Sequence, residues 1–227
     1  THISSILEQT YDNYEVLYIN DCSTDNTLQE VKKLVDDNPK FIIIDNKDNM
    51  GATYNYTNFD KYMKDDEEIV IHLDGDDWLA TPTVLEELNK FYHKNDLWMT
   101  YGGFVVWSGG EETTQPYPQS TEYNNFTHKY NKYREDLWRA SHLRTYKWFL
   151  YKNIDKKDFV SKIDNKLFWH GSDLAWAYPC LEMCPEDKIG VVDFVTHVYN
   201  ASQENQVRTQ EREHQNNHIF EQELRNK

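Results

Sequence analysis

The chain has 227 residues, enough for one large domain, and its 39 acidic and 24 basic residues give a net charge of −15. Binding to nucleic acids or to anionic membranes needs a basic face, so this charge disfavours both kinds of partner. No apolar run approaches the ~20 residues that cross a bilayer, so the sequence predicts no transmembrane segment. Cys22, Cys180 and Cys184 form no disulfide framework and lack the spacing of a zinc site.

Predicted strands and helices alternate through the first hundred residues. Short apolar runs predict strands over residues 15–20, 41–45 and 69–73. Apolar residues at helical spacing predict helices over residues 3–9, 28–35, 52–63 and 83–93. This alternation is typical of βαβ units, in which helices cover both faces of a parallel sheet.

The pattern becomes less regular in the second half of the chain. A strand is expected over residues 97–107, and a polar loop or lid over residues 108–130. The later elements are expected to be a helix over residues 174–183, strands over 189–192 and 194–199, and a charged helix over 202–227.

Carboxylates follow two of the predicted strands. The strand over residues 69–73 runs into Asp74, Asp76 and Asp77, and the first strand is followed by Asp21. Parallel strands end at the same edge of a sheet, where open α/β sheets bind ligands. Three acids so close repel one another unless a cation lies among them, and oxygen ligands suit magnesium or manganese. The alternative is an acidic helix start in which Asp77 serves only as a cap.

The sequence contains neither a GxxxxGK[ST] loop nor a GxGxxG loop for binding phosphates. A phosphate-bearing ligand would therefore be held by carboxylates and a metal ion, which neutralises a diphosphate. This combination points to a nucleotide-diphosphate leaving group.

Three motifs in order carry a resemblance to a known family. They are SILEQTY at residues 5–11, INDCSTDNT at residues 19–27 and HLDGDD, a DXD motif, at residues 72–77. Together they resemble glycosyltransferase family 2, whose members have the GT-A fold. The family pattern has an acid where this chain has Asn20 and a glycine where it has Cys22.

The resemblance implies an α/β, Rossmann-like GT-A fold, with a mainly parallel sheet flanked by helices and a smaller mixed region on the acceptor side. It implies one domain over residues 1–200, with a nucleotide-binding part over about 1–107 and an acceptor-side part over about 108–200, before a charged helix over 201–227. The family's N-terminal strand is missing and the chain opens without Met, so we expect the sequence to be a piece of a longer protein.

For the donor, the resemblance implies that Asp21 contacts the nucleotide base, Asp74 contacts the ribose and Asp76 binds the metal. Gly51 and Asn55 lie in a segment that resembles the family's loop closing on the nucleotide, although a plain turn into a helix is the alternative. Whether Asp77 assists the metal or caps a helix stays open.

For the transfer step, the resemblance implies that Asp173 is the base that takes the acceptor's proton; a helix N-cap is the alternative. Arg144, with His142, is expected to stabilise the leaving phosphate or position the acceptor, unless Arg144 pairs with a surface acid. The resemblance also makes His197 a late metal ligand, the alternative being a structural histidine.

The sequence thus predicts a metal-dependent inverting glycosyltransferase that uses manganese or magnesium. It would move a sugar from a nucleotide-diphosphate sugar, with a UDP-sugar expected, to a hydroxyl on a glycan or a protein side chain. A nucleotidyltransferase with a similar sheet and a non-catalytic carbohydrate-binding domain are the alternatives. The charged C-terminal helix is expected to meet a neighbouring domain or a second copy of the chain.

Overall fold

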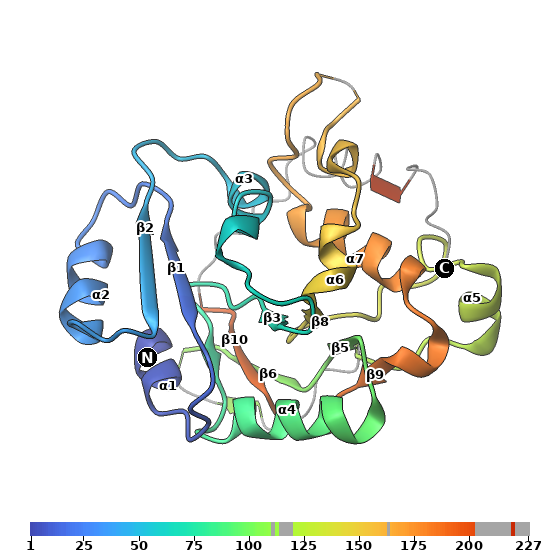
Figure 1. Ribbon diagram of the computed structural model, residues 1–227, viewed down its shortest axis with the longest axis horizontal. Coiled ribbons are helices and arrows are strands. Elements are labelled where there is room, and N and C mark those ends of the chain that lie inside the picture. The colour runs from blue at the N-terminus through green and yellow to red at the C-terminus, as the bar shows by residue number, and fades with distance from the viewer. Residues whose placement is uncertain (110–111, 114–119, 163, 203–218, 221–227) are drawn as a thin grey trace.

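A computed structural model describes residues 1–109, 112–113, 120–162, 164–202 and 219–220. The first unit is a two-stranded parallel sheet covered by two helices (Figure 1). Its elements are α1 (His2–Leu7), β1 (Val16–Asn20), α2 (Thr27–Val35) and β2 (Phe41–Asp45). The strands pair in register from Val16 opposite Phe41 to Asn20 opposite Asp45. Ile3 of α1 and the buried pair Val31 and Val35 of α2 form the core beneath them, since residues four apart share one helix face.

A second sheet carries the strand that ends at the acidic loop, defined as residues 74–77. Its strand order is β3 (Ile69–Ile71), β8 (Thr145–Lys147), β5 (Met99–Tyr101) and β9 (Ile189–Val191). β8 runs antiparallel to both of its neighbours, and β5 and β9 are parallel. The buried hydroxyl of Thr145 fixes β8 in this place, because it lies 2.6 Å from Thr100 Oγ1 and 2.8 Å from the hydroxyl of Tyr92.

A third sheet runs beside the second one. Its order is β4 (Trp78–Leu79), β10 (His197–Asn200), β6 (Phe104–Trp107) and β7 (Glu112–Thr113). Gly102 and Gly103 separate β5 from β6, and both have positive φ. A Cβ at Gly103 would stand 2.1 Å from the carbonyl oxygen of Phe194, so only glycine fits there. The expected strand over residues 97–107 is therefore two strands in two sheets.

Helices complete the structure. They are α3 (Ala52–Tyr56), α4 (Val84–Asn95), α5 (Asn125–Tyr130), α6 (Trp148–Lys152) and α7 (Ser172–Met183), with short 3₁₀ turns at Asp60–Tyr62, Lys156–Phe159 and Glu186–Lys188.

Helix α7 lies in the main hydrophobic core. Every residue from Ala175 to Leu181 is buried, which is typical of a helix that is apolar on all sides. Glu182 at its end forms a buried ion pair with Arg134, whose guanidinium also donates to the carbonyl oxygen of Ile219. The described end of the chain is thereby attached to α7.

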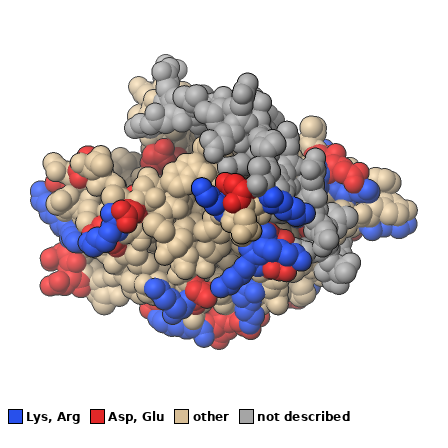
Figure 2. Space-filling model, turned by 90° about the horizontal axis from the view of Figure 1, so that it is seen from above, with Lys and Arg blue, Asp and Glu red and all other residues tan. Residues whose placement is uncertain are grey.

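The α/β class and the GT-A fold are confirmed, with described sheets that contain both parallel and antiparallel pairs. The sequence pattern did not reveal that β8 inserts between β3 and β5. The predicted helix over residues 202–227 and part of the predicted loop lie outside the described residues. Within the described part, no helix is long and apolar enough to span a membrane. Figure 2 shows basic and acidic side chains interspersed over one face, with no extended basic patch among its coloured residues.

Cys22 has φ of 61° and so keeps the left-handed backbone that a glycine would adopt freely. A left-handed residue with a side chain costs ~1–2 kcal/mol, whereas glycine adds ~0.5–1 kcal/mol of unfolded-state entropy. We therefore expect Cys22→Gly to raise the free energy of unfolding in urea by about 0.5–1 kcal/mol. Ser23→Gly is the control, because Ser23 lacks a positive φ and should lose stability. Equal losses in both variants would contradict a strained Cys22.

Candidate active site

The carboxylate of Asp21, directly after β1, holds the loop over residues 46–51. One oxygen accepts hydrogen bonds from Asn46 Nδ2 at 2.8 Å and from the Met50 N–H at 3.0 Å, and the other accepts from the Gly51 N–H at 2.8 Å. Partial burial raises the pKa of Asp21, but these hydrogen bonds outweigh burial and hold the pKa below its ordinary value. The ionised carboxylate therefore shapes this loop.

Gly51 and Asn55 belong to the same network. Asn46 Nδ2 also donates to Asn55 Oδ1 at 2.8 Å. Gly51, with φ of 80°, is the N-cap of α3, and a Cβ on it would lie 3.1 Å from two ring carbons of Trp169. The structure thus brings together Asp21, predicted to contact the nucleotide base, and Gly51 and Asn55, predicted for the loop that closes on the nucleotide.

Asp74 lies three residues after β3, and charged side chains from other parts of the candidate site influence its pKa. Desolvation by the surrounding protein raises the pKa of Asp74, and the charge of Arg144 partly offsets this effect. The carboxylates of Asp77, Asp173 and Asp76 raise the pKa further. Asp74 therefore stands where added positive charge stabilises its ionised form.

Arg144 and Asp173 form an ion pair. Arg144 Nη1 lies 3.2 Å from Asp173 Oδ2, and the two side chains are 7% and 41% exposed. The guanidinium lies over the rings of Trp138 and Trp176, with its carbon 5.9 Å and 5.7 Å from their centroids. These rings fix a cation that would otherwise be mobile. Arg144 therefore pairs with an acid, as the alternative interpretation had it, and this acid is Asp173, the predicted base.

Asp173 does not cap its helix. It is the second residue of α7, whose N-cap is Gly171 in a left-handed conformation, and no side chain makes a cap hydrogen bond there. The N-cap interpretation of Asp173 is therefore wrong. Its carboxylate is free of that task and partly open to solvent, as a residue that accepts a proton from a substrate must be.

Asp77 connects the acidic loop to β10 and α1. Its side chain is 1% exposed, and Oδ2 lies 2.9 Å from His197 Nε2 while Oδ1 accepts the Asn200 N–H at 2.8 Å. His2 Nδ1 lies 2.7 Å from its carbonyl oxygen. Helix α4 begins at Val84 with Thr83 as its N-cap, so the interpretation of Asp77 as a helix cap is wrong.

His197 has one ring nitrogen left for a metal. A carboxylate only accepts hydrogen bonds, so Nε2 carries the proton that binds Asp77. Nδ1 is buried and has no hydrogen-bond partner among the described residues, so in the neutral ring its lone pair is available. Metal-binding histidines commonly donate their other N–H to a carboxylate in this way, so the arrangement fits a divalent cation.

His142 lies beside His197, with ring centroids 5.1 Å apart. Burial, followed by the nearby Arg144 and His197, lowers the pKa of His142 to about 2, so the ring is neutral. One possible ligand atom from each of Asp77, His142 and His197 lies within 4.8 Å of the other two. His142 is therefore a candidate neighbour of a metal at this place.

Asp76 is exposed and does not belong to this cluster of ligand atoms, so its assignment as a metal ligand stays a prediction. Two residues escaped the sequence analysis. Burial raises the pKa of Tyr56, and the charges of Asp74 and Asp173 raise it further. Trp169 packs on Gly51. Neither has a sequence signal beyond the high aromatic content of the chain.

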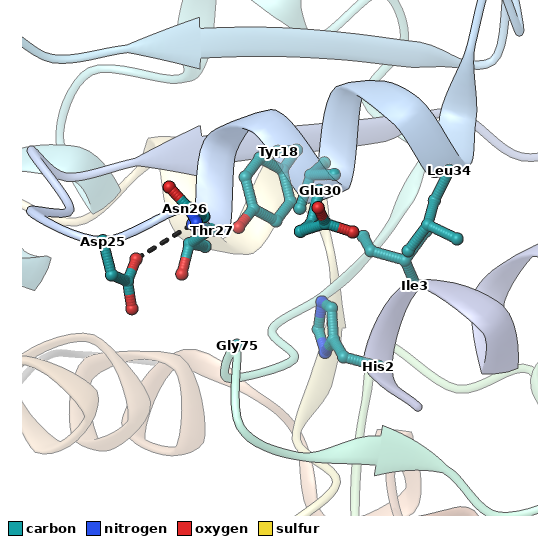
Figure 3. A pocket seen from close by; sticks show the side chains of 10 residues that line it. His2, Ile3, Tyr18, Asp25, Asn26, Thr27, Glu30, Leu34 and Gly75 are labelled. Atoms are coloured by element: carbon teal, nitrogen blue, oxygen red, sulfur yellow. Dashed lines mark hydrogen bonds between the residues drawn. The ribbon is translucent and has the colours of Figure 1, made fainter.

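A groove of about 470 Å³ lies between α1 and α2 and reaches the acidic loop only at Gly75 (Figure 3). None of the predicted site residues is among those that line it. Asp25 and Glu30 on its wall would repel a diphosphate. We therefore place the candidate site at the strand ends, where the ligand atoms and the charges converge.

We expect Asp77→Ala to lower the free energy of unfolding by roughly 3 kcal/mol, because it leaves two buried N–H groups without an acceptor. Asp77→Asn should lose less, since the amide can still accept from Asn200 and can donate to Nε2 once the imidazole proton moves to Nδ1. Asp76→Ala is the control and should change stability by less than ~0.5 kcal/mol, because Asp76 is exposed. Urea unfolding measures all three, and equal values for Asp77→Ala and Asp76→Ala would contradict the connecting role of Asp77.

Comparisons with known proteins identify the family of the chain. The model of the family described as Glycosyl transferase family 2 matches residues 2–159. Two proteins of Haemophilus influenzae, each named an uncharacterized glycosyltransferase, are 34% and 30% identical over 109 and 104 residues. Each match covers 45% of this chain and 31% or 40% of the relative, so the chain spans well under half of their length.

Solved structures share the fold. A crystal structure of S. aureus TarS has a TM-score of 0.62 at 18% identity, over 88% of this chain and 34% of TarS. A complex of TarS 1–349 with UDP has a TM-score of 0.55 over 88% of this chain and 55% of that one. The family model covers most of the chain and all three sequence motifs, so this chain belongs to glycosyl transferase family 2.

Proposed function

We propose that this protein is a metal-dependent inverting glycosyltransferase that moves a sugar from a UDP-sugar to a hydroxyl on a glycan or a protein side chain. The observation that carries the proposal is the Arg144–Asp173 ion pair beside Asp74, at the strand edge where the family binds its donor. Membership of the family supports the reaction type. The complex of TarS 1–349 with UDP, which shares the fold, supports uracil as the base.

In this proposal the donor's nucleoside lies between two loops. Asp21 holds the loop over residues 46–51 in shape and keeps lone-pair capacity on Oδ2, which accepts one N–H from Gly51. That oxygen can accept the imide N–H of uracil. Asp74 can accept a hydrogen bond from a ribose hydroxyl, which disperses the charge that its acidic neighbours oppose.

The diphosphate needs positive charge at a strongly acidic edge. We assign Asp76 and Nδ1 of His197 as ligands of manganese or magnesium, with Asp77 orienting the imidazole and His142 as a further candidate ligand. When bound, the metal would neutralise the diphosphate as it leaves. Arg144 is close enough to Asp173 to bring a second positive charge to the reacting groups.

The chemistry proposed for Asp173 is general-base catalysis. The acceptor oxygen forms a bond to the anomeric carbon while the bond from that carbon to the diphosphate breaks, and Asp173 takes the acceptor's proton. Attack from the face opposite the leaving group inverts the anomeric configuration. Arg144 holds one carboxylate oxygen of Asp173, which leaves the other oxygen to meet the acceptor.

The proposed function is tested by binding and hydrolysis of donors. The purified chain is expected to bind UDP more tightly with manganese than without it, and to release UDP slowly from one of a panel of UDP-sugars. Asp76→Asn should lose most of the manganese-dependent gain in UDP affinity, because it removes a charged ligand. Titration calorimetry measures the affinities, with Asp37→Asn as the control on an exposed acid between α2 and β2, outside both loops. A wild-type chain that binds neither UDP nor GDP, with or without manganese, would sink the proposal.

Asp173→Asn should reduce transfer to an acceptor by at least about a hundredfold, because general-base catalysis contributes ~10²–10⁴ in rate. Its UDP affinity should stay within about twofold of the wild type, since the proton acceptor is not assigned to the nucleotide. A transfer assay with the acceptor and sugar donor found for the wild type measures the first value. Full activity in Asp173→Asn would show that another group takes the proton.

A further inference from the structure

Trp169 is a large apolar side chain held in an exposed position. Its side chain is 51% exposed, whereas its neighbour Phe168 is 1% exposed. Phe168 donates its N–H to the Phe159 carbonyl at 2.9 Å, and Val160 and Leu167 form a β-bridge beside it. The backbone that carries Trp169 is therefore anchored.

The ring of Trp169 joins two parts of the candidate site. On one side it packs against Gly51, whose N–H binds Asp21. Along the chain, Trp169 is followed by Gly171, the left-handed N-cap of α7, and by Asp173, four residues after it. Four residues span at most ~14 Å, so a short oligosaccharide that touches the ring can reach the proposed base.

Two other exposed apolar residues lie near Gly51 or Trp169 along the chain. Met50, which precedes the glycine under the ring, is 38% exposed, and Leu167 is 36% exposed. Single exposed apolar residues are normal on a protein surface and need no explanation. Trp169 differs from these residues because its backbone is anchored through Phe168 and its ring packs on Gly51 of the candidate site.

The surface suits the chemistry of a sugar ring. A pyranose has a face of C–H groups that packs on an aromatic ring, and hydroxyls on its edge that need polar partners. A nucleobase also stacks on aromatic rings, but the proposed function places the base at Asp21 and the ribose at Asp74. Trp169 belongs to the stretch of chain that leads into Asp173, and the acceptor hydroxyl must meet that residue.

We propose that Trp169 is the platform on which a sugar ring of the acceptor stacks, so that the acceptor is a glycan and its hydroxyl is presented to Asp173. This inference rests on the proposed function and narrows it from hydroxyl acceptors in general to sugar-ring acceptors. Gly51 supports the platform, because any side chain there would meet the indole at 3.1 Å.

The test compares Trp169→Ala and Trp169→Phe with the wild type. The probes are the methyl β-glycosides of glucose, galactose and N-acetylglucosamine, their disaccharides, and ribitol as a polyol without a ring. Saturation-transfer NMR and calorimetry measure binding of these probes with UDP and manganese present. Phe126→Ala is the matched control, because Phe126 is an aromatic side chain 63% exposed on α5.

The wild type should bind at least one ring probe and bind ribitol more weakly. Trp169→Ala should weaken that ring probe by roughly threefold to tenfold, with Trp169→Phe between it and the wild type. The UDP affinity of Trp169→Ala should stay within about twofold of the wild type. Phe126→Ala should match the wild type in both measurements.

Three results would overturn the inference while leaving the proposed function intact. They are a wild type that binds UDP but none of the ring probes, a Trp169→Ala variant with unchanged affinity for the ring probe, and a variant whose UDP affinity falls as much as its sugar affinity. The last would assign the ring to the nucleotide. Failure of the wild type to bind any nucleotide removes the proposed function itself. Thermal unfolding shows whether each variant is folded.

Discussion

The bond between Asp77 and His197 is the constraint on which the rest of the site depends. The two residues are 120 positions apart, and both side chains are 1% exposed. A buried carboxylate is tolerated only when its lone pairs are used, and here the His197 ring and the Asn200 N–H use both oxygens. The bond fixes the acidic loop against β10. It also makes Nε2 the donor to Asp77, so in the neutral ring Nδ1 carries the lone pair that a metal ligand requires.

Arg144 is a second buried charged residue of the candidate site whose contacts hold it in place. A guanidinium that is 7% exposed needs several partners, and it has two indole rings and the carboxylate of Asp173. Because Trp176 lies in α7, the helix that presents Asp173 also presents a ring to the cation beside it. The proposed base is thus oriented by its own helix, and its position depends on the packing of the main core rather than on a mobile loop.

Much of this arrangement follows from the sequence, and the reasons are local. Apolar runs that end in acids placed Asp21 and Asp74 at strand ends, since strand direction and chain order are sufficient for that inference. Gly51 and Asn55 were predicted from the resemblance of their segment to the family's nucleotide loop, and the structure connects both of them to Asp21, Gly51 directly and Asn55 through Asn46. The helix that carries Asp173 was also predicted, because an apolar run of ten residues is long enough to be distinguished from a strand.

The sequence could not reveal contacts between distant segments. Nothing near Asp77 indicates that its partner is His197 rather than a helix N-terminus, and nothing near Thr145 indicates that β8 separates β3 from β5. The predicted alternation of strands and helices is a one-dimensional pattern, and an antiparallel strand inserted from later in the chain leaves it unchanged. Trp169 was missed for the same reason, because an indole is notable only once its exposure and its glycine neighbour are known.

The sequence contains no phosphate-binding glycine loop, and this bears on how the candidate site would bind a diphosphate. Backbone N–H groups at a helix N-terminus can hold a diphosphate without metal, and this chain offers acids at the corresponding strand ends instead. Acids repel a diphosphate, so the proposed function places a cation between them. In that proposal Asp77 acts without touching the substrate, because its hydrogen bond orients the His197 imidazole as a metal ligand, while Arg144 orients the proposed base Asp173.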